Sequence, residues 1–400
     1  MASLVAFFLT GLAAFLTIPV VIFVIEISAA LLLSRRGLAG PPKEYVRKRI
    51  AVIVPAHNES VGILPTLADI KQQLLANDRL VVVADNCVDD TSAIAAHAGA
   101  ETIVRHEPEA AGKGYALDFG LKHLSLDPPA IVIVIDADCR ITKDTIAQLS
   151  LTCAMTGRPV QALDLMTAPE GLTINYRVAE FAWRIKNWVR PLGLSVLNFP
   201  CQLMGTGMAF PWEIIFSANL ANGSIVEDLK LGLDLAKEGA PALFCPTACV
   251  TSPFPQSIKG ARSQRKRWEE GHIGLILKTV PQFVREAIAS RNLGLFVLAL
   301  DLAIPPLSLL VILLTVMTGL AGITAMLGIS FSPLAISVGS AAALALAIFL
   351  SWLKYGRDIL PPLAIFSVIS YVFAKLPIYG CLLSGRFDLH WIRTDRKKNK

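Results

Sequence analysis

Charged side chains are scarce in this 400-residue chain: Asp, Glu, Lys and Arg make up 17% of it, and hydrophobic residues make up 54%. Soluble domains average roughly 25% charged and 45–50% apolar residues. The mean hydropathy of +0.56 excludes a disordered or collagen-like chain and a small disulfide-bonded scaffold. The composition therefore predicts an integral membrane protein that carries a soluble domain.

Regular cysteine patterns are also missing. The seven cysteines are scattered and none belongs to a C-x-x-C pair, so the sequence predicts neither a disulfide framework nor a zinc site. Most of them lie in the predicted soluble domain, which suits a reducing compartment. The net charge is only +6, and the basic residues gather at membrane edges. A nucleic-acid partner is not needed to explain this net charge.

Long uncharged runs account for the apolar excess. Residues 4–25 form a 22-residue run that is long enough to cross a bilayer. No Lys or Arg precedes this run, which argues against a signal peptide. Residues 302–353 form a 52-residue uncharged run with room for two spans, and residues 359–374 form a short last apolar segment. We expect four spans, give or take one.

Basic residues predict the orientation. The first span is followed by Arg35, Arg36, Lys43, Arg47, Lys48 and Arg49. By the positive-inside rule the N-terminus faces out and the next domain is cytoplasmic. Four spans would then place the basic tail outside, where the same rule disfavours it. Glu26 lies near the inner end of the first span, and we interpret it as an interfacial, snorkelling side chain.

Residues 50–251 read as a soluble α/β domain. Short β-branched runs at 50–54, 80–84 and 131–135 alternate with helical patterns at 64–75 and 93–98. Such continuous apolar strands are typical of a parallel sheet covered on both faces. Ligands bind at the carboxyl ends of the strands in these sheets.

Carboxylates follow two of these strands. Asp136 and Asp138 form a D-x-D motif, and in an extended chain the two side chains point the same way. Their oxygens suit Mg²⁺ or Mn²⁺ beside a diphosphate, although a turn or helix cap also explains many such motifs. Asp85 ends the second strand in the expected ligand crevice; Asp89 or Thr91 could instead cap the next helix.

Further motifs follow in order along the chain: Pro55 to Glu59, a Gly-Lys-Gly loop around Lys113, Gly205-Thr206-Gly207, Glu227-Asp228, and Q-x-x-R-W at Gln264, Arg267 and Trp268. The lysine loop lacks the Walker spacing, which disfavours a phosphoryl-transferring NTPase. Taken singly, the last three motifs fit a turn, a helix N-terminus and a basic interfacial helix.

Taken in order, the motifs resemble the cellulose synthase and hyaluronan synthase branch of family 2 glycosyltransferases. The resemblance implies an α/β GT-A domain with a Rossmann-like mixed sheet and an α-helical transmembrane bundle. It divides the chain into an N-terminal transmembrane helix (1–34), a cytoplasmic catalytic domain (48–255), amphipathic interface helices (256–292), C-terminal transmembrane helices (293–383) and a basic tail (384–400).

The resemblance also implies roles for single residues. Pro55, Glu59 and Asp85 correspond to nucleoside-binding positions, Lys113 and Asp136 to donor contacts, and Asp138 to the ligand of Mg²⁺ or Mn²⁺. Asp228 corresponds to the catalytic base. Gln264, Arg267 and Trp268 correspond to the clamp over the pyrophosphate. The acceptor side is implied at Gly205, Thr206, Glu227 and Trp268.

The implied activity is inverting transfer from a UDP-sugar to a growing polysaccharide or lipid-linked acceptor, in exopolysaccharide synthesis at the bacterial inner membrane. Single addition to a membrane glycolipid is the near alternative, and a non-catalytic nucleotide- or polymer-binding subunit is the distant one. The sequence departs from the family pattern at Asn86, where a second Asp is usual, and matches the acceptor motif at 201–207 loosely. The tail at 391–396 resembles the ending of related bacterial enzymes.

Overall fold

The computed structural model describes residues 2–33, 46–169, 174–221, 226–255, 257–376 and 379. The predictions about Arg35, Arg36, Lys43 and the tail 384–400 lie outside these residues. The chain folds as two compact units. The sheet unit comprises Arg35–Pro169, Asn198–Trp268 and Leu389–Lys400, and the helical unit comprises Met1–Ser34, Glu170–Leu197 and Glu269–Asp388.

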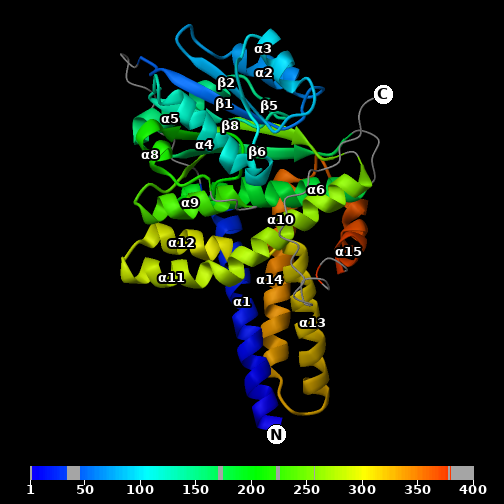
Figure 1. Ribbon diagram of the computed structural model, residues 1–400. Coiled ribbons are helices and arrows are strands. Elements are labelled where there is room, and N and C mark those ends of the chain that lie inside the picture. Colours follow the sequence, from blue (N-terminus) through cyan, green and yellow to red (C-terminus); the bar gives the residue numbers. More distant parts are fainter. Residues whose placement is uncertain are drawn as a thin grey trace. The chain divides into compact units, whose positions relative to one another are not determined.

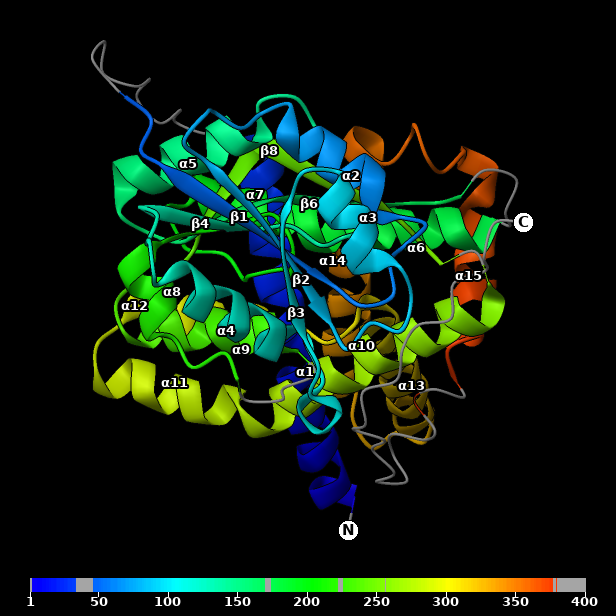
Figure 2. The ribbon, with the colours of Figure 1, turned by 45° about the horizontal axis from the view of Figure 1, so that its top comes forward.

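The sheet unit is built on one mixed sheet of order β3-β2-β1-β4-β7-β6-β8-β5 (Figure 2). Its strands are β1 (Ile50–Ala56), β2 (Arg79–Asp85), β3 (Glu101–Arg105), β4 (Ile131–Val134), β5 (Arg140–Ile141), β6 (Val160–Thr167), β7 (Met208–Pro211) and β8 (Leu243–Pro253). Strands β1 to β4 pair in parallel, and β7 runs antiparallel to both β4 and β6. This arrangement confirms the predicted mixed sheet.

Helices cover both faces of the parallel strands. They are α2 (Ile63–Lys71), α3 (Thr91–His97), α4 (Lys113–Leu124) and α5 (Thr145–Thr156). Ile63 and Leu67 of α2 pack in one core with Val52 and Val54 of β1. On the opposite face a Cβ at Gly120 of α4 would lie 3.1 Å from Val83, so the missing side chain lets α4 approach the sheet. The remaining helices of the unit are α8 (Trp212–Ser217) and α9 (Glu227–Lys237).

The D-x-D motif lies in a turn and not in a strand. Strand β4 ends at Val134, and the amide of Cys139 donates to the Asp136 carbonyl oxygen at 3.2 Å. The prediction of an extended D-x-D was therefore wrong. The two side chains still come close together, because the turn folds the chain back at the end of the strand.

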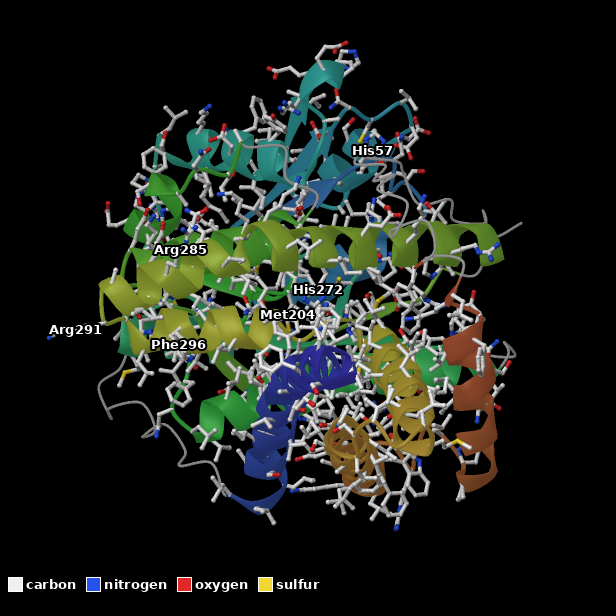
Figure 3. The ribbon with its side chains drawn as sticks, turned by 90° about the horizontal axis from the view of Figure 1, so that it is seen from below. His57, Met204, His272, Arg285, Arg291 and Phe296 are labelled. Atoms are coloured by element: carbon white, nitrogen blue, oxygen red, sulfur yellow. The ribbon has the colours of Figure 1, made fainter. Side chains whose placement is uncertain are left out.

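The helical unit contains α1 (Ala2–Leu32), α6 (Ile174–Arg184), a π-helical turn (Ile185–Val189), α7 (Arg190–Val196), α11 (Val280–Ala289), α12 (Leu293–Leu302), α13 (Leu307–Met326), α14 (Ser332–Tyr355), the short 3₁₀ helix Pro362–Ala364 and α15 (Ile365–Phe373). Helix α10 (Ile258–Lys278) crosses the boundary between the units. Helix α1 packs along α14, which packs against α13 (Figure 1). Helices α11 and α12 can be found in Figure 3 by two labelled residues, Arg285 on α11 and Phe296 on α12.

Three helices among the described residues are long and apolar enough to cross a membrane: α1, α13 and α14. The uncharged run 302–353 divides into α13 and α14, as its length predicts. The last apolar segment forms the nine-residue helix α15, which is too short to span. Three candidate spans lie at the lower end of the predicted four, give or take one.

Residues 170–197 differ from their predicted place. The sequence assigns them to the catalytic domain, whereas the structure groups them with the helices of the helical unit. Arg190 of α7 donates to Glu26 Oε2 of α1 at 2.7 Å and to Asp301 Oδ1 of α12 at 2.5 Å. Glu26 is 1% exposed, so our interpretation of it as a snorkelling side chain was wrong.

Candidate active site

The loops after β1 and β2 hold each other in place. A ring nitrogen of His57, labelled in Figure 3, lies 2.8 Å from the Asp85 carbonyl oxygen. The amide of Glu59 donates to Thr91 Oγ1 at 2.8 Å. The amides of Ser60 and Thr91 donate to the Asp89 carboxylate at 3.2 and 3.1 Å. Asp89 and Thr91 therefore hold the backbone at Glu59 and Ser60. The predicted helix cap at Asp89 or Thr91 was wrong, because the N-cap of α3 is Asp90, which makes no side-chain cap hydrogen bond.

Asp85 lies at the end of β2 and is 6% exposed. Arg105, the last residue of β3, donates to its carboxylate at 2.6 Å. The side chain of Asn86 bridges the same two strand ends: it donates to Asp85 Oδ1 at 3.1 Å and accepts from the Glu107 amide at 2.7 Å. These contacts give Asn86 a structural role at the position where the family usually has Asp.

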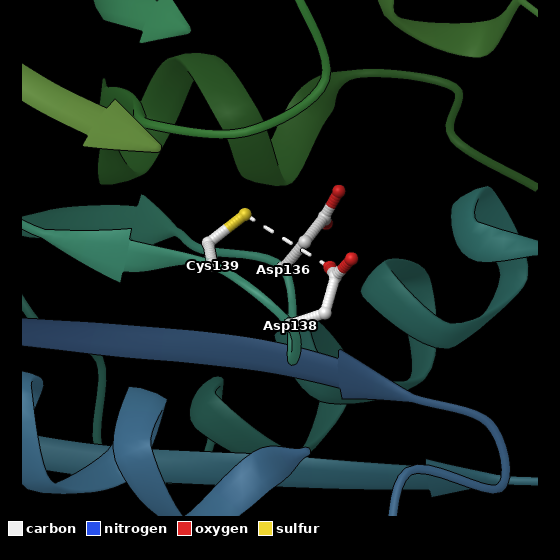
Figure 4. Close-up of side chains that lie close together, drawn as sticks. All are labelled: Asp136, Asp138 and Cys139. Carbon is white, nitrogen blue, oxygen red and sulfur yellow. Dashed lines mark hydrogen bonds between the residues drawn. The ribbon is translucent and has the colours of Figure 1, made fainter. Parts of the chain in front are cut away.

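Asp136, Asp138 and Cys139 gather after β4 (Figure 4). One ligand atom from each lies within 4.8 Å of the others. The Asp136 amide donates to Thr206 Oγ1 at 3.0 Å, and the Cys139 thiol lies 3.5 Å from the same oxygen. Thr206, predicted on the acceptor side, thus fixes the backbone of the acidic turn.

Lys113 joins this acidic turn to the Gly205 loop. Its ammonium group donates to the Asp136 carboxylate and, at 2.7 Å, to the Gly205 carbonyl oxygen. Burial favours the neutral amine, but the charges of Asp136 and Glu227 outweigh it and raise the pKa of Lys113. A fixed positive charge therefore lies among the carboxylates.

Gly205 brings the chain close to Asp228. Its φ of +93° is in the region that favours glycine. A Cβ there would lie 3.4 Å from Asp228 Oδ2 and 3.8 Å from the Lys113 nitrogen. Gly205, Asp228 and Lys113 consequently form one surface at the start of α9.

Glu227 and Asp228 begin helix α9. Burial, reinforced by the charge of Asp228 and opposed by Lys113, raises the pKa of Glu227 to about 7. A carboxyl group with that pKa changes charge near neutral pH, where a general base or acid is most effective.

The Q-x-x-R-W motif lies on α10. Gln264, Arg267 and Trp268 share one helix face because they are three and four residues apart. Burial lowers the pKa of Arg267, and the charge of Glu227 opposes this shift. The charge of Glu227, at the start of α9, therefore acts on the Arg267 guanidinium.

The structure thus assembles Lys113, Asp136, Asp138, Gly205, Thr206, Glu227, Asp228 and Arg267 through these contacts and electrostatic interactions. Pro55, Glu59 and Asp85 lie at the ends of the neighbouring strands β1 and β2. Sequence reasoning missed Arg105, whose only signal was its place at the end of a short strand.

Residues 47–271 match the sequence profile of the family described as "Glycosyltransferase like family 2". The match covers more than half of the chain. The chain belongs to glycosyltransferase family 2.

One similar member is "Probable glycosyltransferase YdaM" of Bacillus subtilis, which is 26% identical over 255 residues, or 59% of this chain and 58% of that protein. The chain thus spans less than two thirds of that relative. Among solved structures, mannosyltransferase PcManGT from Pyrobaculum calidifontis, in complex with GDP-Man and Mn²⁺, superposes with a TM-score of 0.53 at 18% identity, over 86% of this chain and 99% of that one. This likeness confirms the GT-A fold.

The acidic turn of this family 2 glycosyltransferase fits a divalent metal. Asp136 and Asp138 offer hard oxygen ligands, which Mg²⁺ and Mn²⁺ prefer. Lys113 already neutralises part of the charge of Asp136, and Asp138 supplies a second carboxylate beside it. The soft Cys139 thiol is 2% exposed, and burial raises its pKa well above the usual range.

Proposed function

We propose that this protein transfers a sugar from a nucleotide-sugar donor to a hydroxyl group of an acceptor that is held at a membrane. The observation that carries the proposal is the convergence of Lys113, Asp136, Asp228 and the Gly205 loop at the carboxyl end of the parallel strands. Open α/β sheets bind ligands at this edge. Membership of family 2 supports the reaction class.

Donor binding is divided between two groups of residues in this proposal. Pro55, Glu59 and Asp85 contact the nucleoside, as the family motifs imply. Lys113 and Arg267 supply positive charge to the diphosphate, and Gln264 lies on the same helix face as Arg267. Mg²⁺ or Mn²⁺, held by Asp138 with Asp136 beside it, would neutralise negative charge on the diphosphate when bound.

Asp228 is the proposed base. It lies in the first turn of α9 next to Gly205, so it can accept the proton of an acceptor hydroxyl that reaches its carboxylate. Positive charge at Lys113 and Arg267 stabilises the leaving diphosphate, where negative charge grows during the reaction. Direct attack by the acceptor would invert the anomeric carbon.

The acceptor is the less constrained half of the proposal. Glu227, Gly205 and Trp268 remain its proposed contacts, whereas the hydroxyl group of Thr206 is used by the Asp136 amide. The complete Q-x-x-R-W favours a polysaccharide synthase of the cellulose and hyaluronan synthase branch. Three candidate spans among the described residues make a small bundle, which favours single addition to a lipid-linked acceptor instead.

Three apolar helices support a membrane location. We infer a bacterial inner membrane with the sheet unit on the cytoplasmic side, because nucleotide sugars are cytoplasmic substrates and basic residues follow the first span.

A donor screen tests this function. Purified full-length protein in bilayer nanodiscs is incubated with Mn²⁺ or Mg²⁺ and a panel of UDP- and GDP-sugars, and the released nucleotide is measured. GDP-sugars belong in the panel because the similar archaeal structure contains GDP-Man. We expect release with one UDP-sugar, and sizing of the radiolabelled product then separates a polymer from a single addition. Nucleotide binding without release from any donor would favour a non-catalytic subunit and contradict the proposal.

A further inference from the structure

Arg105 lies at the centre of a buried hydrogen-bond cluster at the ends of β2 and β3. The residue is 5% exposed. One guanidinium nitrogen donates to Asp85 Oδ1 at 2.6 Å. The other donates to Glu107 Oε2 at 3.0 Å and to the Ala110 carbonyl oxygen at 2.8 Å. A buried guanidinium with three acceptors is held in one orientation, because its charge is compensated by the buried Asp85 carboxylate and the two further hydrogen bonds fix its plane.

The same guanidinium lies over an aromatic ring of α4. Its central carbon is 5.5 Å from the centroid of Tyr115, which is two residues after Lys113. Arg105 therefore contacts the segment that carries Lys113 on both sides: at Glu107 and Ala110 before it, and at Tyr115 after it.

The contacts to Asp85 leave it suited to a ligand. Arg105 and Asn86 both donate to the same carboxylate oxygen, Oδ1. Within the described part of the chain, Oδ2 is then the oxygen that can accept from a ligand. A carboxylate offers only acceptors, so Oδ2 suits a ligand that donates an N–H or O–H group.

We propose that Arg105 is a positioning residue that couples the nucleoside contact at Asp85 to the diphosphate contact at Lys113. The inference rests on the proposed function, since it assigns the donor to these two residues. Arg105 acts through its neighbours and touches neither the sugar nor the reacting atoms. Its loss weakens donor binding more than it slows transfer once the donor is bound.

Nucleotide binding and transfer kinetics test this proposal separately. Isothermal titration of the full-length protein in nanodiscs, with Mn²⁺ and with UDP or GDP as probe, gives Kd for wild type and Arg105→Met. We expect Kd to rise about tenfold or more, about 1.4 kcal/mol, because Arg105→Met removes the group that orients Asp85 and the segment before Lys113. KM for the donor rises with it, and kcat stays within about threefold of wild type.

Arg79→Met is the matched control. Arg79 forms an ion pair with Glu101 at 2.8 Å at the other end of the same two strands, so its loss loosens β2 and β3 without touching Asp85. An equal rise in Kd for both variants would show a general structural effect and overturn the proposal.

Conservative variants keep the test decisive if Arg105→Met unfolds. Arg105→Lys retains the positive charge but cannot donate hydrogen bonds to Asp85 and Ala110 together. We therefore expect a Kd between those of wild type and Arg105→Met. Asp85→Asn and the double variant Asp85→Asn with Arg105→Lys complete a double-mutant cycle. We expect the effects of the two substitutions on Kd to be coupled, because Arg105 and Asp85 are in contact. Additive effects on Kd would overturn the proposal. Wild type that binds neither UDP nor GDP would instead contradict the proposed function itself.

Discussion

Glu227 is a buried carboxyl group whose surroundings bring its pKa close to neutral pH. Burial, with the nearby Asp228, raises its pKa to about 7 in the folded protein, against an ordinary value of 4.5. Between these two values the folded state binds more protons than the unfolded state. The free energy of unfolding therefore falls as the pH rises through this window.

Replacing Glu227 with Gln removes the ionisable group and with it this loss of stability at high pH. We expect Glu227→Gln to raise Tm by about 2–4 °C at pH 8, the shift that 1 kcal/mol gives in a domain of this size. At pH 5 the two proteins should have nearly the same Tm, because the wild-type carboxyl group is then protonated. Thermal unfolding at both pH values measures the difference, and a Tm gain at pH 5 alone would contradict the assigned pKa.

The individual site residues differ in how far the sequence predicts them. The placement of Asp85, Asp136 and Asp138 at the ends of apolar strands was predictable from hydrophobic runs, while their roles remain predictions. Arg105 and Asn86 were not, because their partners are set by strand pairing between β2 and β3. The local sequence does not predict which side chains come together when β2 and β3 pair in parallel.

At the scale of elements, Arg190 links helices α1, α7 and α12. It pairs with Glu26 and Asp301, and all three side chains are buried. Arg184 forms a comparable pair with Asp358, whose side chain is 63% exposed. The two arginines therefore allow a buried ion pair to be compared with an exposed one in the same unit.

Removing Arg190 should destabilise the helical unit strongly. Arg190→Met leaves two buried carboxylates without their cation, which costs about 3–5 kcal/mol. Arg184→Met should cost about 1 kcal/mol or less, since its partner is solvated. Thermal unfolding in detergent compares the two variants. Equal losses of Tm would show that the Arg190 cluster does not hold the three helices together.

Part of the secondary structure was predictable from hydrophobic patterns: the runs at 50–54, 80–84 and 131–135 are strands β1, β2 and β4, whereas the other five strands of the sheet were not predicted. The grouping of residues 170–197 with the other helices of the helical unit was not predictable. Its cause is a set of long-range contacts, such as Arg190 to Glu26, and nothing in the local pattern of α6 and α7 distinguishes them from helices of an α/β domain.

At the scale of the whole molecule, the number of spans decides the orientation. Four spans place the basic tail outside, against the positive-inside rule. The three candidate spans among the described residues remove that conflict, because an odd number places the two termini on opposite sides. We therefore expect the N-terminus outside and the tail in the cytoplasm.

Cysteine labelling in intact cells tests this topology. Leu327, between α13 and α14, is 69% exposed, and Leu126 in the sheet unit is 84% exposed. An impermeant maleimide should label Leu327→Cys from outside, and Leu126→Cys only after permeabilisation, with wild type giving the background of the native cysteines. Labelling of Leu126→Cys in intact cells would reverse the predicted orientation.

The most direct test of the account separates donor binding from sugar transfer at Asp228. In Asp228→Asn we expect transfer to fall by about 10²–10⁴, the usual contribution of a general base, while Kd for UDP with Mn²⁺ changes by less than about threefold. Asp234→Asn is the control, because Asp234 lies on the same helix and pairs with Lys230; it should retain activity. Full transfer by Asp228→Asn, with metal and donor binding unchanged, would contradict the proposed mechanism.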